Sequence, residues 1–142
     1  MYTTPLIDYH THTTYSTDGH SSMREMTAAA AAAGIAQIAV TDHYDPDYPE
    51  DGWGGGFSLV DYQNELDIVR EEFKERITLI KGLEVGIQHG GTLEKCRQTV
   101  GVYDYDFIIG SFHCAEGFEL SCGVFFENRS VEEATAAFYK YT

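Results

Sequence analysis

Short apolar runs alternate with longer amphipathic segments along the chain. Four runs are rich in β-compatible apolar side chains, and they span residues 6–9, 35–41, 77–85 and 106–110. Four segments carry helical periodicity or helix-capping signals, and they span residues 22–33, 58–73, 92–100 and 130–142. Because alternating short strands and helices are typical of βα units, the pattern predicts four such units and a parallel sheet.

Helix-capping signals fix where two of these helices begin. Ser22 is followed three positions later by Glu25, and Ser130 is followed in the same way by Glu133. In this arrangement, the capping box, each side chain binds the other residue's backbone amide. Gly34 directly follows the first helical segment and is a typical helix stop.

Side chains able to bind metal ions occur at the end of every predicted strand. In chain order they are Asp8, His10 and His12 after the first strand, Asp42 and His43 after the second, Glu84 at the end of the third, and His113 after the fourth. In parallel α/β folds the loops at the carboxyl ends of the strands converge, and sites are built there. The sequence therefore predicts one shared cluster at that edge of the sheet.

The spacing and chemistry of this cluster favour a transition-metal site. His10 and His12 are two positions apart on an extended chain, so both side chains point to one side and can hold one ion. Imidazoles combined with a carboxylate suit zinc, manganese or iron better than calcium or magnesium. Glu84 has two carboxylate oxygens and can bridge two ions, which an imidazole cannot do.

Length and charge narrow the classes of function. The 142 residues suit one domain, and 43% hydrophobic residues suffice for a core. Nine Lys and Arg against 23 Asp and Glu give a formal net charge of −14. This charge argues against binding to nucleic acid or to an anionic membrane surface, and it is compatible with acidic residues around bound cations.

The sequence predicts a cytoplasmic protein. The N-terminal residues lack the basic and apolar regions of a signal peptide. The most apolar stretch, residues 28–40, is too short to span a bilayer. Three cysteines, Cys96, Cys114 and Cys122, are an odd number without a C-x-x-C pair, which favours reduced thiols.

Taken together, four short motifs resemble those of a known family. Asp8-x-His10-x-His12, Thr41-Asp42-His43, Gly82-Leu83-Glu84 and Gly110-Ser111-x-His113 occur in this order. They are similar to the first four motifs of the PHP (polymerase and histidinol phosphatase) family. The flanking residues 9–19, 81–86 and 108–113 resemble its histidinol-phosphatase branch.

The resemblance implies a distorted (βα)7 barrel with two or three divalent ions, zinc, manganese or iron, at the carboxyl ends of the strands. By the motifs, His10 and His12 hold a first ion, which Glu84 bridges to a second ion bound by His113. Asp18 and His43 hold a third ion. The expected substrate is a small phosphorylated molecule, most simply L-histidinol phosphate in histidine biosynthesis. Water activated by the ions attacks the phosphorus, so that no protein nucleophile is needed.

The remaining polar residues are assigned supporting roles. Asp8 and Asp42 are expected to orient the ligands or to be structural. His20 and His89 are candidates for substrate contact, with ordinary helix-entry and loop roles as the alternatives. Cys114 is expected to be a small buried residue in a βα turn and not a nucleophile.

An acidic segment, residues 45–56, follows the second strand and contains Asp45, Trp53 and three consecutive glycines. It lacks the ligand pattern of a calcium loop. We expect a flexible loop, either a lid over the mouth of the site or an exposed loop without a function.

The later family motifs, a further His and an Asp-x-His, have no counterpart, because residues 114–142 contain neither His nor Asp. We therefore expect residues 1–142 to form an incomplete PHP domain, the first four βα units of the barrel. Four parallel strands leave an open edge, which a second copy in a homodimer could cover. Three functions remain open: the histidinol-phosphate phosphatase, a PHP phosphoesterase acting on nucleotides or nucleic acid, and a metal-binding module without turnover.

Overall fold

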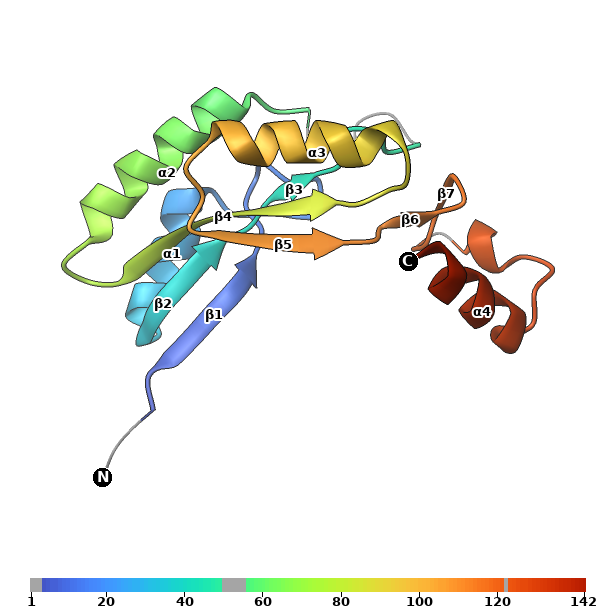
Figure 1. Cartoon of the computed structure of the whole chain (residues 1–142). Helices are drawn as coiled ribbons and strands as arrows, with labels where there is room; N and C mark the ends of the chain where they lie inside the picture. The colour runs from blue at the N-terminus through green and yellow to red at the C-terminus, as the bar shows by residue number, and fades with distance from the viewer. Residues whose placement is uncertain (1–3, 50–55, 122) are drawn as a thin grey trace.

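The computed structural model describes residues 4–49, 56–121 and 123–142. In chain order the elements are β1 (Leu6–Thr11), α1 (Met23–Ala32), β2 (Ile35–Val40), β3 (His43–Tyr44), α2 (Leu59–Phe73), β4 (Thr78–Gly86), α3 (Gly91–Val102), β5 (Phe107–Ser111), β6 (Cys114–Ala115), β7 (Phe118–Glu119), the 3-10 turn η1 (Val124–Phe126) and α4 (Val131–Tyr141). All eight predicted strands and helices are present, with ends that differ by a few residues. Helices α1 to α3 flank the sheet (Figure 1).

Both predicted capping boxes are present. The side chain of Ser22 accepts a hydrogen bond from the amide of Glu25, and the side chain of Glu25 accepts one from the amide of Ser22. Ser130 and Glu133 repeat this arrangement at the start of α4. Because the first amides of a helix lack internal partners, these reciprocal bonds fix where α1 and α4 begin.

The main sheet is entirely parallel, as predicted. Strand β4 lies at its centre, with β2 and β3 on one side and β5 on the other, and β1 pairs with the outer side of β2. The edge strand β1 exposes Leu6 and Ile7 by 65% and 58%. The core beneath the sheet is formed by apolar residues of β2, β4, α1 and α2, including Leu66, Leu79 and Leu83.

The second predicted strand corresponds to β2, and a short strand that was not predicted follows it. β2 ends at Val40, and the chain resumes as β3, in which His43 lies opposite Glu84 of β4. At the interruption the carboxylate of Asp42 accepts hydrogen bonds from the loop that follows β1. These hydrogen bonds separate β2 from β3, which pairs with β4 as an additional short strand beyond the predicted one.

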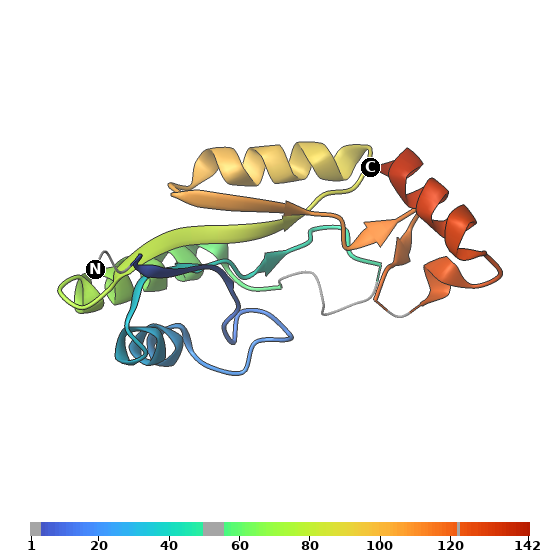
Figure 2. The same cartoon turned by 90° about the horizontal axis from the view of Figure 1, so that it is seen from below.

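The segment after β5 also differs from a simple βα unit. β6 and β7 form an antiparallel hairpin, which places Cys114 in a short strand and not in a βα turn. Cys114 is fully buried, as expected, and Cys96 is also a buried thiol. Helix α4 lies beyond the carboxyl ends of β4 and β5 and does not cover the sheet (Figures 1 and 2). It packs in a separate small cluster with Ala115 and Phe125.

The hydroxyl of Tyr62 contacts the backbone of both β2 and β4. Its fully buried hydroxyl lies 3.1 Å from the carbonyl oxygen of Gly82 and 3.3 Å from that of Val40. The amide of Asp42 donates to the same hydroxyl over 3.3 Å. Because both strands carry candidate site residues just beyond these contacts, Tyr62 fixes the spacing of the two strand ends.

Tyr62→Phe is therefore expected to lower the free energy of unfolding by about 1–3 kcal/mol, since it leaves the buried Asp42 amide unsatisfied. Urea unfolding measures the change. Tyr139→Phe is the matched control, because Tyr139 is 73% exposed and its hydroxyl should contribute less than about 0.5 kcal/mol. Equal effects of the two substitutions would contradict the role given to the Tyr62 hydroxyl.

Candidate metal centre

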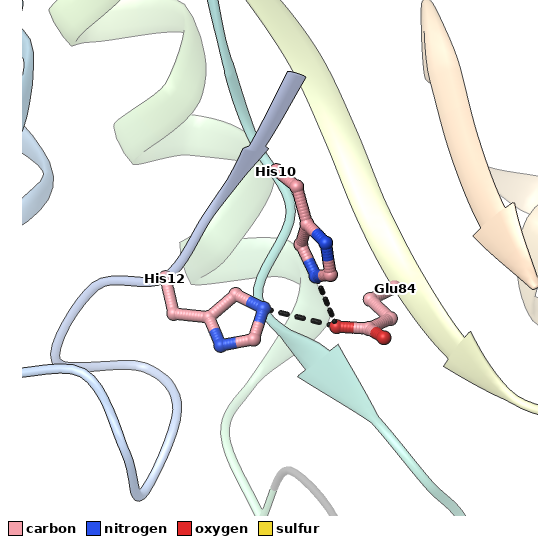
Figure 3. Close-up of side chains that lie close together, drawn as sticks. All are labelled: His10, His12 and Glu84. Carbon is pink, nitrogen blue, oxygen red and sulfur yellow. Dashed lines mark hydrogen bonds and ion pairs between the residues drawn. The ribbon is translucent and has the colours of Figure 1, made fainter. Parts of the chain in front are cut away.

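The carboxyl ends of the parallel strands bring the predicted ligands together. His10 lies near the end of β1 and His12 just after it, while Glu84 projects from the central strand β4. In Figure 3 both imidazoles point toward the same oxygen of the Glu84 carboxylate. The Nε2 atoms of His10 and His12 each lie 2.9 Å from Glu84 Oε2. The alternation of side chains along β1 thus gives the predicted pair.

The two carboxylate oxygens of Glu84 face different partners. Oε2 faces His10 and His12, and it also lies 3.4 Å from Nδ1 of His43. Oε1 lies 3.1 Å from Nε2 of His113 and accepts a hydrogen bond of 2.6 Å from Ser111. Glu84 is only 3% exposed. This division of partners is the geometry that a bridging carboxylate requires.

Within the described residues, three groups offer ligand atoms that lie within 4.8 Å of one another: His10, His12 and Glu84; His12, Asp18 and His43; and His43, Asp45 and His113. All six predicted ligands occur in these groups. His12 and His43 each belong to two groups, so the three form one continuous cluster. The donor set of four imidazoles and three carboxylates suits divalent metal ions.

Asp45 is the member that the sequence interpretation missed. It was assigned to a flexible loop, but it is 3% exposed, and its carboxylate oxygens lie 2.9 and 3.1 Å from Nδ1 of His113. The signal was available, because Asp45 is two positions beyond His43, the same spacing as His10 and His12. Strand β3 keeps the chain extended there, so both side chains face the cluster.

Gly86 on β4 makes room for Asp45. A side chain at position 86 would overlap the Asp45 carboxylate, because a Cβ atom built there meets the carboxylate oxygens. A glycine at this position lets the carboxylate lie against the β4 backbone beside His113. The remainder of the acidic segment is only partly described. Asp47 accepts hydrogen bonds from Thr92 and Lys95 of α3, whereas residues 50–55, including Trp53, lie outside the described residues.

Opposite charges in the cluster hold each other ionised. Burial raises the pKa of Glu84, but hydrogen bonds from His113, His12, Ser111 and His10 outweigh burial and hold this pKa far below its usual range. The hydrogen bond to Glu84 raises the pKa of His12 to about 9. Burial lowers this pKa, and Asp18 raises it further. Burial lowers the pKa of His113, but Asp45 and Glu84 outweigh it and raise this pKa to about 10. Burial lowers the pKa of His43.

Metal binding is consequently expected to release protons. With pKa values of about 9 and 10, His12 and His113 are protonated at pH 7.5, whereas an imidazole must be neutral to coordinate a metal. Zinc binding at pH 7.5 should release at least about two protons per chain, and affinity should rise with pH. Calorimetry in buffers of different ionisation enthalpy measures this release. In His113→Ala the release should fall by about one proton, and a binding enthalpy independent of the buffer would contradict the prediction.

The same shifts set how the metal-free fold responds to pH. The raised pKa values of His12 and His113 mean that their stabilising contribution is complete below their unfolded value of 6.5 and is lost as the pH rises through 9 to 10. The lowered pKa of Glu84 acts in the opposite direction, so that its contribution is present above the unfolded value of 4.5 and is lost on acidification.

Asp42 is the hub of a buried network behind the ligands. Its carboxylate accepts bonds from the amide and hydroxyl of Thr13, at 2.6 and 2.8 Å, and from the hydroxyl of Ser16, at 2.8 Å. The Ser16 hydroxyl in turn accepts a 2.9 Å bond from the amide of His43. Asp42 is fully buried, and burial raises its pKa despite these bonds. The network ties the loop between His12 and Asp18 to the strand that carries His43.

The other predicted residues lie around the cluster. Asp8 accepts a 3.2 Å hydrogen bond from the amide of His10. His20 is exposed and lines a cavity of about 540 Å³ together with His10, His12 and Asp18. His89 lies outside the ligand groups, because its ring packs against Tyr141 and hydrogen-bonds to the carbonyl oxygen of that residue. Within the described residues, each helix is too short or too polar to cross a membrane.

A parallel α/β sheet with histidines and carboxylates clustered at its strand ends is the arrangement of α/β proteins that bind metal ions at that edge of the sheet. Residues 8–141 match the PHP domain family, and the chain belongs to this family. The match covers the predicted motifs and extends through α4. The family assignment made from the four motifs is confirmed.

Histidinol phosphatases are among the similar proteins. The chain is 31% identical to the histidinol-phosphatase of Lactococcus lactis subsp. lactis (strain IL1403) over 127 residues, which are 89% of this chain and 46% of that protein. It is 33% identical to a probable histidinol-phosphatase of Deinococcus radiodurans over 112 residues, which are 78% of this chain and 43% of that protein. The chain spans about half the length of the curated relatives that it matches.

A solved structure gives the same relationship in three dimensions. The crystal structure of histidinol phosphate phosphatase from Lactococcus lactis, complexed with zinc, L-histidinol and phosphate, superposes with a TM-score of 0.86 at 29% sequence identity. The superposition covers 96% of this chain and 51% of that one. The predicted fold class, parallel strands with flanking helices of the PHP type, is therefore confirmed.

Proposed function

We propose that the protein is a metal-dependent phosphomonoester hydrolase whose substrate is L-histidinol phosphate. The observation that carries this proposal is the placement of Glu84, whose two oxygens face separate sets of imidazoles. A centre of two or more adjacent ions suits the hydrolysis of a phosphate dianion. The Lactococcus lactis relative, which binds zinc, L-histidinol and phosphate, supports the choice of substrate.

The roles of the residues follow from the three groups. His10, His12 and Glu84 would hold one ion, Glu84 and His113 with Asp45 a second, and Asp18 with His43 a third. Zinc, manganese and iron all suit these ligands. Bound divalent ions neutralise the phosphate dianion and bring the pKa of a coordinated water toward neutrality. Other side chains of the chain orient these ligands. Ser16, which is held by Asp42, accepts a hydrogen bond from the His43 amide, and Ser111 donates one to the Glu84 carboxylate.

Because the chain spans about half the length of its relatives, we treat residues 1–142 as an incomplete PHP domain. These residues contribute a continuous cluster of seven candidate ligands. Activity of the whole protein, its substrate and any pairing of two copies along the exposed β1 edge are part of this proposal.

The test compares substrates with the zinc-loaded protein. Phosphate release from L-histidinol phosphate is expected to exceed release from a nucleoside 5′-monophosphate by at least about tenfold in kcat/KM. The phosphate is a dianion in both, but L-histidinol phosphate also carries a cationic amine, which a protein of net charge −14 favours. A preference for the nucleotide, or for a DNA oligonucleotide, would contradict the choice of substrate. Tight zinc binding without any phosphate release would contradict the enzymatic function and favour a metal-binding module.

A further inference from the structure

A second cavity adjoins the metal centre. Its volume is about 370 Å³, which lies within the usual range of small-molecule sites. Its lining includes the candidate ligands Asp18, His43 and His113. It also includes Glu119, Leu120 and Ser121 from the β6–β7 hairpin and the segment that follows it. The cavity therefore connects the metal centre to a segment that supplies no candidate metal ligand.

A buried carboxylate also lines this cavity. Glu119 is 7% exposed, and one of its carboxylate oxygens accepts a 3.1 Å hydrogen bond from the amide of Ser121. Its side chain also hydrogen-bonds to the hydroxyl of Tyr48, and burial together with this bond raises the pKa of Tyr48. Both contacts hold the Glu119 carboxylate at the cavity wall.

Aromatic side chains also line this cavity. Tyr48 follows β3 and Phe112 precedes His113, and both line the cavity. Aromatic faces together with a buried carboxylate make an environment that favours a flat or compact cation. A neutral alcohol would gain little from the carboxylate, and an anion would be repelled by it.

We propose that Glu119 determines substrate specificity by binding a cationic nitrogen in the alcohol portion of the phosphomonoester. This inference rests on the proposed function, because it assumes that the phosphate group occupies the metal centre. With the phosphate held there, the adjoining cavity receives the rest of the substrate. An ammonium or imidazolium group then meets the Glu119 carboxylate, while Tyr48 and Phe112 flank it.

Binding of L-histidinol to the zinc-loaded protein, measured by calorimetry, tests this role without turnover. Glu119→Gln keeps the size and the acceptor oxygen but removes the charge, and it should weaken L-histidinol binding about 10–100-fold. Glu127→Gln is the matched control, because Glu127 is exposed and does not line the cavity. Equal affinities for L-histidinol in Glu119→Gln and the unaltered protein would overturn the proposal.

Kinetics with two substrates provide the second measurement. In Glu119→Gln, kcat/KM for L-histidinol phosphate should fall about 10–100-fold, whereas kcat/KM for glycerol 3-phosphate, whose alcohol is neutral, should stay within about twofold. An equal loss for both substrates would overturn the proposal, since it would indicate general damage to the site. The unaltered protein also tests it without any variant, because equal kcat/KM values for the two substrates would overturn it.

These outcomes separate the inference from the proposed function. If the zinc-loaded protein releases phosphate from neither substrate, the proposed function fails. If it hydrolyses both equally well, the proposed function holds and the role of Glu119 fails. The zinc content of Glu119→Gln should match that of the unaltered protein, because Glu119 belongs to none of the three ligand groups.

Discussion

Replacing Glu84 with glutamine is expected to weaken zinc binding by at least about 100-fold, more than the loss of a residue behind a ligand. Glu84 contacts His10, His12, His43 and His113, so the amide removes the negative charge from the centre of the cluster. Phosphate release should fall in parallel with zinc occupancy. Competition with a zinc-binding indicator measures the affinity.

The control for this prediction is Glu132→Gln, an equally conservative change at an exposed position of α4. It should leave zinc affinity within about twofold, since surface positions away from a site have small effects. If Glu84→Gln retains the zinc affinity of the unaltered protein, Glu84 is not a ligand, and the bridging arrangement is wrong.

Asp42→Ala is expected to give the largest loss of stability, about 3–5 kcal/mol in the free energy of unfolding. The substitution removes the acceptor for the Thr13 amide, the Thr13 hydroxyl and the Ser16 hydroxyl, all of them buried. Each unsatisfied buried donor costs about 1–3 kcal/mol. Because Ser16 also binds the amide of His43, zinc affinity should fall as well. Urea unfolding of the metal-free protein measures the stability without the contribution of bound zinc.

Asp8→Ala is the matched control within the same set of predicted supporting residues. Asp8 is only half-buried and accepts one hydrogen bond, from the amide of His10, so its loss should cost less than about 1 kcal/mol. If the two alanine substitutions change the free energy of unfolding equally, Asp42 is not the hub of the network.

The fold and most of the candidate centre could be predicted because the signals are local. Alternation along an extended strand places His10 and His12 on one side, and parallel strands bring their carboxyl ends to one edge. Glu84 needed only its position at the end of an apolar run. Capping boxes are equally local, since Ser22 and Glu25 are three residues apart.

Features that depend on distant partners could not be predicted in this way. The carboxylate of Asp42 is satisfied by Thr13 and Ser16, more than 20 residues earlier in the sequence, and this contact separates β2 from the short strand that carries His43. Asp45 was overlooked because the acidic residues after it suggested a loop, whereas the pairing of β3 with β4 places it directly after a strand that carries His43. Likewise, no local signal places α4 beyond the strand ends, where Tyr141 meets His89.

Helix α4 packs against Phe112, a residue that lines the second cavity. Phe112, which precedes His113, packs edge-on against Phe138 and Tyr141 of α4, with ring centroids 6.4 and 6.3 Å apart. This contact links the helix to the cavity that Phe112 lines. Helix α4 therefore supports the wall of the candidate substrate cavity.

The central claim, that clustered divalent ions at the strand ends hydrolyse a phosphomonoester, is tested most directly by the metal dependence of phosphate release. Protein stripped of metal with a chelator and then dialysed should release no phosphate from L-histidinol phosphate, and zinc should restore the release at two or three ions per chain. The double variant His10→Ala, His12→Ala should not recover under the same treatment. Undiminished release by the metal-free protein, or by this double variant, would contradict the account.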